Sequence, residues 1–422
     1  MEKKERGNSM KKITLIVILI LGVGGTFLLT GCAGTQEEDP FGDTAIVETT
    51  PPYIVAYNKG YTQAAAKNWA GAVPFYEEAE AHLMKLSEEQ LKEPDTENIY
   101  QKTLMGLALA YGNMGNMGKS AGYFKKYINR WPADINGYLN YGAILEKNGQ
   151  SEDAFAQYTK AMNVNPKSAV AEFALASIYR QDGRLDDAIT YYKKGLAKDP
   201  GFQDGNGWFQ LGKTYEDKGD YDGQIKAYEE MIRVRPDDWQ AYFFLADAYL
   251  TKGMKVGAEK ARLTSADREL RISYYDKAIN TDKKGLSIRP DSAQIMTHLA
   301  SSLIRKAEMY NKGTTQYAKI AEESIGVLEQ FTKVYPDNEK GYALLADAQQ
   351  KLRNFTGAIA NARKSLEIMD NAYAHSILGD VFFILERWQE SKVHYQAIAS
   401  NPQYPYVRGR LEIIEARIRG EY

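Results

Sequence analysis

Hydrophobic residues recur at helical spacing along most of the chain, in helix-sized blocks separated by glycine-containing turns and prolines. The pattern is most regular in residues 133–236. There, Pro132, Pro166 and Pro200 lie 34 residues apart, and Pro236 comes two residues late. Each interval holds two amphipathic blocks, which predicts two helices per interval. Because proline lacks an N–H and disfavours helix in the residue before it, each proline is expected to end a second helix.

Within each interval, small and aromatic residues keep fixed places. Small residues occupy one place in the first block: Gly142, Ala176, Gly212 and Ala246. Tyrosines occupy one place in the second block: Tyr158, Tyr192 and Tyr228. We expect the small residues to let two antiparallel helices approach closely and the tyrosines to fill the space between neighbouring pairs. A single pair cannot bury its apolar face, so this pattern predicts a stack of pairs.

One segment carries the pattern most completely. From Trp208 to Pro236 the chain reads W-x-x-L-G-x-x-Y, followed by a turn at Gly219 and a second helix containing Tyr228. This motif and the 34-residue period resemble the tetratricopeptide repeat family. The resemblance implies an all-α solenoid, wound as a right-handed superhelix of about nine helix pairs.

The resemblance extends over residues 53–404, and an amphipathic segment at 405–422 is predicted to form a capping helix. Two closing prolines, Pro290 and Pro336, come late. We therefore expect insertions that lengthen helices or add loops, with a joint between two repeat blocks at 254–289.

The N-terminus has a different character. Lys11 and Lys12 precede an apolar run, which predicts a signal peptide over residues 1–31. The sequence Leu29-Thr30-Gly31, directly before Cys32, resembles the bacterial lipobox. This implies cleavage before Cys32, the only cysteine, and attachment of lipid to its thiol. An uncleaved signal anchor with an incidental cysteine is the alternative.

Lipidation would tether the mature chain to a membrane, since two or more acyl chains anchor a protein stably. The residue after Cys32 is Ala33 and not aspartate. In a double-membraned bacterium, lipoprotein sorting rules then imply the outer membrane, facing the periplasm. Residues 32–52 are acidic and predict a flexible linker, unless the part near Ile46 packs on the first repeat. We also expect translation to start at Met10.

A row of apolar residues follows the first helices at one repeat position: Met105, Leu139, Phe173, Phe209 and Phe243. Arg180, Lys213 and Asp247 flank this row. In the family, this position lines the concave face, so the resemblance implies a groove that binds an extended or helical peptide with apolar anchors. The alternative is that these side chains pack inside the solenoid.

Candidate catalytic chemistry is scarce. The four histidines, His82, His298, His375 and His394, form no H-x-x-x-H motif, and we interpret each as a surface or packing residue. No phosphate-binding loop is present. A single cysteine excludes a cysteine-based metal site. We therefore expect no catalytic residue, metal or cofactor. The 53 basic and 55 acidic residues give no support for nucleic-acid binding.

These features predict a lipid-anchored scaffold that recruits protein partners in the bacterial envelope, with pilus, secretion or outer-membrane assembly as the expected setting. Two alternatives stay open. The aromatic residues could bind glycan within a polysaccharide-export or wall-remodelling machine. A hydrolase site could lie in the 254–289 insertion.

Overall fold

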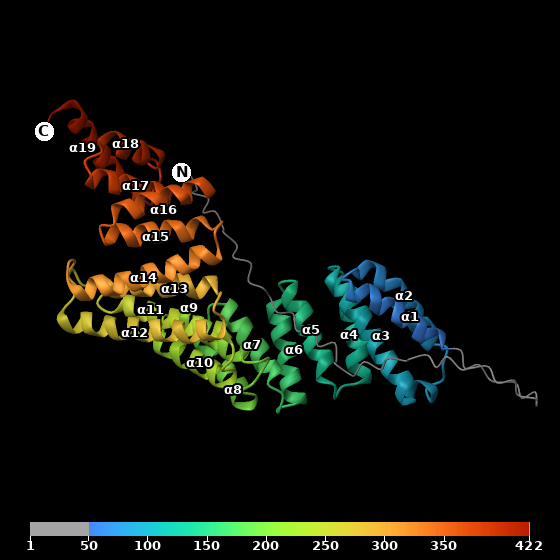
Figure 1. Cartoon of the computed structure of the whole chain (residues 1–422). Coiled ribbons are helices and arrows are strands. Elements are labelled where there is room, and N and C mark those ends of the chain that lie inside the picture. Colours follow the sequence, from blue (N-terminus) through green and yellow to red (C-terminus); the bar gives the residue numbers. More distant parts are fainter. Residues whose placement is uncertain (1–49, 422) are drawn as a thin grey trace, which may run out of the picture. The chain divides into compact units, whose positions relative to one another are not determined.

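The structure, a computed structural model, describes residues 50–421. The predicted signal peptide, its lipobox, Cys32 and most of the predicted linker lie outside these residues. The described part contains nineteen α-helices and a short 3-10 helix, η1 (Figure 1). Their bounds are α1 Pro52–Ala65, α2 Trp69–Leu83, η1 Gln90–Lys92, α3 Pro94–Asn113, α4 Met117–Arg130, α5 Ile135–Lys147, α6 Ser151–Val164, α7 Val170–Gln181, α8 Leu185–Lys198, α9 Asn206–Lys218, α10 Tyr221–Val234, α11 Trp239–Lys255, α12 Ser265–Ile288, α13 Ala293–Ala307, α14 Thr315–Val334, α15 Glu339–Lys351, α16 Phe355–Ile368, α17 Ala372–Ile384, α18 Trp388–Ala397 and α19 Val407–Arg419.

The described helices form nine consecutive packed pairs, from α1 with α2 to α17 with α18, followed by α19. This confirms the predicted all-α repeat solenoid. The last helix buries Val407 and Ile414 against Tyr395 and Ile398, as a helix that covers the end of a stack should. No described helix has the length and apolar character needed to cross a bilayer.

Glycine–tyrosine contacts join the two helices in five of the described pairs. A Cβ added to Gly142 would lie 2.5 Å from the ring of Tyr158, and one added to Gly212 would lie 2.4 Å from the ring of Tyr228. The small residues therefore allow the close approach predicted from the sequence. Each of these rings packs on the glycine of its own pair, and Tyr228 also lies against the next pair, as the sequence predicts: its ring centroid is 5.7 Å from that of Phe244 on α11. The same contact recurs at three further glycine–tyrosine pairs: Gly60 with Tyr76, Gly253 with Tyr275, and Gly379 with Tyr395.

The chain divides into two compact units, one ending at Asp199 and the other beginning at Pro200. The sequence had predicted a joint at 254–289 instead. Those residues belong to the second unit, where they complete α11 and build the 24-residue helix α12. The lengthened helices pack on each other and bury Tyr249, Tyr275 and Ala278 in a common core. This shared core explains why the insertion does not separate two blocks.

Helix ends follow local capping rules. Thr264 and Asp267 form a capping box at the start of α12: each side chain accepts a hydrogen bond from the backbone N–H of the other residue. Ser87 and Gln90 form the same reciprocal hydrogen bonds, at 2.9 and 3.2 Å, at the start of η1.

Within each unit, the first helices of several neighbouring pairs contact each other. In the first unit, α3 contacts α1 and α5, and α5 contacts α7. In the second unit, α11 contacts α13, and α15 contacts α17. Side chains that point away from the second helices therefore gather on one face of each unit, which we call the first-helix face.

Candidate partner-binding face

In the first unit, the predicted apolar row lies mostly within the core. Leu139 and Phe173 are 6% and 5% exposed. The ring of Phe173 fills the space left by Gly195 on α8, where an added Cβ would meet the ring at 2.9 Å. Met105 is half-buried and packs against the cores around α3 and α4. Leu139 and Phe173 thus contribute mainly to packing, in line with the alternative interpretation.

In the second unit, the row is more open. Phe209 on α9 and Phe243 on α11 are both half-buried. Their rings are joined through Phe244, whose centroid lies 4.7 Å from that of Phe209 and 5.6 Å from that of Phe243. The structure thus brings these two predicted residues into one aromatic cluster, which we call the Phe209–Phe243 cluster.

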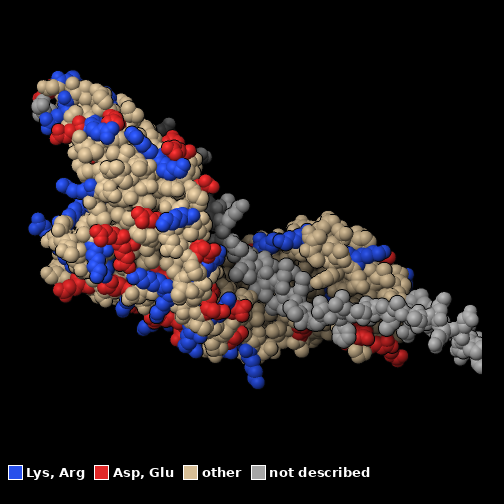
Figure 2. All heavy atoms as spheres, viewed as in Figure 1, with Lys and Arg blue, Asp and Glu red and all other residues tan. Residues whose placement is uncertain are grey.

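Charged side chains flank the row as predicted, and each is partly exposed. Lys213 Nζ lies 2.6 Å from Glu216 Oε2 on the same helix. Arg180 lies at the end of α7 in the first unit. The side chain of Asp247, one turn after Phe243 on α11, is 47% exposed. On the face seen in Figure 2, acidic and basic side chains are interspersed, so the local pairs decide the electrostatics.

A buried ion pair lies behind Asp247, and the sequence interpretation missed it. His298 on α13, which the sequence predicts to be a surface or packing residue, belongs to this ion pair. Its Nδ1 lies 2.8 and 3.0 Å from the two carboxylate oxygens of Asp282 on α12, a residue with no exposed surface. Its Nε2 lies 3.6 Å from Asp247 Oδ1 and has no hydrogen-bond partner. The ring edge also packs on Phe243, with centroids 5.5 Å apart.

Burial and charge oppose each other at His298. Burial lowers its pKa, but the contacts with Asp247 and Asp282 outweigh this effect and raise the pKa from 6.5 to about 9. Burial raises the pKa of Asp282 to about 6, although His298 acts in the opposite direction. At neutral pH the cluster therefore holds an imidazolium between two carboxylates.

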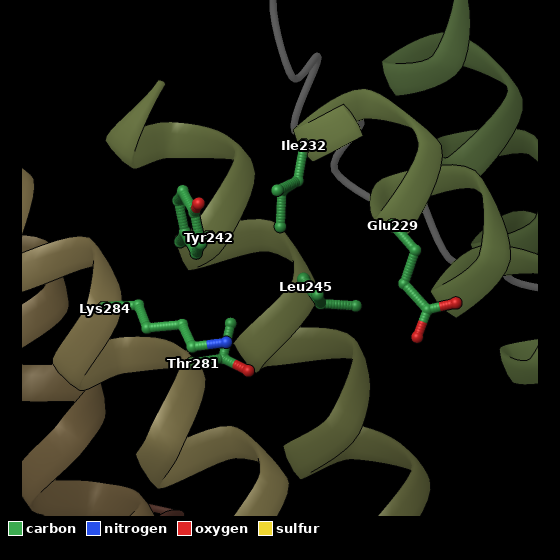
Figure 3. Close-up of a pocket in the computed structure, with 6 residues that line it drawn as sticks. All are labelled: Glu229, Ile232, Tyr242, Leu245, Thr281 and Lys284. Atoms are coloured by element: carbon green, nitrogen blue, oxygen red, sulfur yellow. The ribbon is translucent and has the colours of Figure 1, made fainter. Parts of the chain in front are cut away.

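A shallow pocket lies between α10, α11 and α12 (Figure 3), with a volume of about 180 Å³. Six residues line it: Glu229, Ile232, Tyr242, Leu245, Thr281 and Lys284. Small-molecule sites usually enclose about 300–1,000 Å³. This pocket is therefore large enough for a side chain but smaller than a usual small-molecule site. Among residues 50–421, no group of three His, Cys, Asp or Glu side chains is placed to hold a metal ion.

A stack of antiparallel helix pairs whose first helices share a face defines a helical-repeat scaffold, a class that binds partners on extended surfaces. Models of the tetratricopeptide repeat match residues 135–168, 173–204 and 209–269. The chain is a tetratricopeptide-repeat protein, which confirms the resemblance found in the sequence. Proteins built from these repeats are scaffolds for protein–protein interaction.

Similar proteins include superkiller protein 3 of Schizosaccharomyces pombe, 25% identical over 206 residues. This match covers 47% of the chain and 12% of the relative. The TPR repeat-containing protein MJ1428 of Methanocaldococcus jannaschii is 30% identical over 149 residues, which cover 34% of the chain and 23% of the relative. The matches thus span less than a quarter of either relative. A solved structure, the C-terminal part of a TPR repeat-containing protein from Cytophaga hutchinsonii, is 19% identical with a TM-score of 0.45, covering 68% of this chain and 99% of that one.

Proposed function

We propose that this protein is an envelope scaffold. Its first-helix face takes peptide segments of partner proteins, and lipid on Cys32 holds it at a membrane surface. The observation that carries the binding site is the Phe209–Phe243 cluster. Its two half-buried rings lie on successive first helices, where a bound segment could contact both.

The surroundings of the cluster suit a peptide. Aromatic side chains are typical anchors at protein interfaces, and a polar rim supplies orientation. Lys213 and Asp247 lie four residues after Phe209 and Phe243 on the same helices, so each ring has a charged neighbour one turn away. An extended or helical segment with spaced apolar residues fits this alternation.

The envelope role rests on the segment from Leu29 to Cys32, which lies outside the described residues. A lipobox-like sequence with its cysteine supports a lipid anchor, and Ala33 supports sorting to the outer membrane, facing the periplasm. Within that setting we propose a role in assembling a pilus, a secretion machine or outer-membrane proteins, without catalytic activity of the chain itself.

Site-specific photo-crosslinking tests the binding face. A benzoyl-phenylalanine placed at Phe243 should form adducts with partner proteins in native envelopes. The same group at Leu270, an exposed apolar residue on the second helix α12, serves as the control and should not. Equal protein adducts from both positions would contradict the proposed face. Retention on purified glycan without protein adducts would favour the glycan alternative.

The anchor has its own test. Cys32→Ala should abolish incorporation of radiolabelled palmitate and leave the protein unprocessed or released from membranes. Unchanged labelling of this variant would refute lipidation at Cys32.

A further inference from the structure

Asp247 lies on the first-helix face, and no lysine or arginine among residues 50–421 neutralises its charge. The Asp247 carboxylate has no lysine or arginine nitrogen within 4 Å among residues 50–421; its nearest basic atom is Nε2 of His298, at 3.6 Å. The matched residue on α15, Asp347, is also the ninth residue of its helix but pairs with Lys351 at 2.9 Å. Asp247 is therefore unlike its counterpart.

His298 does not cancel the charge of Asp247, because Asp282 already balances it. The imidazole is about nine-tenths buried and both oxygens of Asp282 contact its Nδ1. Two carboxylates and one imidazolium leave one net negative charge, and only Asp247 presents it to solvent. A buried imidazole that points its Nε2 at Asp247 also restricts where the carboxylate can lie, so His298 acts as a positioning residue.

An aromatic ring lies next to this charge. Phe243 precedes Asp247 by one helical turn, so both side chains reach the same side of α11. Phe243 is half-buried and contacts His298 and Phe244. A carboxylate beside the edge of an aromatic cluster favours a planar cation: the guanidinium of arginine pairs with carboxylates and stacks on rings, whereas lysine presents a compact charge.

We propose that Asp247 and Phe243 form a subsite for an arginine side chain of the bound partner segment, with His298 holding Asp247 in place. The guanidinium would pair with Asp247 and lie against the Phe243 ring. This inference rests on the proposed peptide-binding function and specifies the chemistry of the partner.

Peptide selection tests the subsite without knowledge of the natural partner. A library of displayed random 12-residue peptides is selected on the full-length protein in detergent, and the recovered peptides should be enriched in arginine. The best peptide and a copy with citrulline in place of arginine are then compared by fluorescence anisotropy. Citrulline keeps the shape but removes the charge, and it should weaken binding to the wild type by about tenfold.

Two variants locate the effect. The citrulline and arginine peptides should bind Asp247→Asn with affinities within about twofold of each other, because the variant lacks the carboxylate that pairs with the guanidinium. Asp347→Asn removes the same charge at the matched position of α15 and should retain the tenfold difference. If Asp247→Asn fails to fold, as judged by circular dichroism, Phe243→Leu replaces it and should reduce the difference by about threefold.

The outcomes separate the inference from the function beneath it. If no peptide is recovered on the wild type, peptide binding fails and the subsite fails with it. Peptides that bind the wild type but not Phe209→Ala would support the proposed peptide-binding face. The arginine subsite would still be refuted if citrulline did not weaken binding to the wild type, or if it weakened binding to Asp247→Asn equally.

Discussion

Gly212→Ala tests whether glycine–tyrosine contacts set the spacing of the helix pairs. The glycine lies in the middle of α9 and faces Tyr228 of α10. An added Cβ would lie 2.4, 2.8 and 2.9 Å from three ring atoms, closer than carbon atoms pack. The ring is 1% exposed and touches Phe209 and Phe244, so it has little room to move.

Two opposing terms set the size of the effect. Alanine in place of a helical glycine stabilises by about 0.5–1 kcal/mol through the backbone. Overpacking a filled core costs about 1–3 kcal/mol. With three contacts below 3.0 Å to a rigid ring, we expect the upper part of that range, and hence a net loss of about 1–2 kcal/mol.

Urea denaturation followed by helical circular dichroism measures this loss. Gly326→Ala is the matched control, because Gly326 is also helical and in the second unit but has no atom near its added Cβ. It should raise the midpoint while Gly212→Ala lowers it. Reducing the ring with Tyr228→Leu should recover part of the loss, since the two changes are coupled. If Gly212→Ala is as stable as the wild type, the contact between Gly212 and the Tyr228 ring does not set the distance between α9 and α10.

Three further changes test other parts of the fold. Thr264→Ala removes the capping box at α12 and should cost about 1 kcal/mol, seen as faster amide exchange in the first turn. Phe173→Ala should cost about 3–5 kcal/mol in urea unfolding, because the ring is buried, whereas the half-buried Phe243 should cost less on the same change. Burial lowers the pKa of His394 from 6.5 to about 4, and its neighbour His375 acts in the same direction. The stability from the neutral imidazole should be present above pH 6.5 and lost as the pH falls toward 4; His394→Gln should flatten this part of the urea midpoint–pH curve.

Local and periodic signals predicted the fold well. The Thr264-x-x-Asp267 spacing is itself a signal for a capping box, because both partners lie within one helical turn. Small residues and tyrosines recur at fixed places in the repeats, so the close approach of the two helices could be inferred from one repeat and extended to others, although the contact of each ring with the glycine of its own pair was not inferred. The two-residue delay of Pro236 was also visible in the sequence. In the structure, the two extra residues lie between α8 and α9. Seven residues, 199–205, join these helices, whereas five residues, 165–169, join α6 to α7.

The ion pair at His298 could not be found in this way. Its partners, Asp282 and Asp247, lie on two other helices, and no repeat position relates the three residues. In the sequence, Asp282 and His298 are simply polar residues on two amphipathic helices. Such a pair becomes recognisable when α11, α12 and α13 are packed together, because burial then leaves each charge dependent on the other.

Residues of the predicted apolar row occupy one repeat position but differ in burial. Phe173 and Phe209 occupy the same position in consecutive repeats, yet the first is buried and the second is half-buried. The eleventh residue of the partner helix differs: it is Gly195 in α8 and Met231 in α10. Gly195 leaves space that the Phe173 ring fills, whereas the corresponding residue of α10, Met231, is buried in the core against which Phe209 packs. The glycine on the second helix thus accounts for the deeper burial of the Phe173 ring, whereas Phe209, which faces no such glycine, stays half-buried.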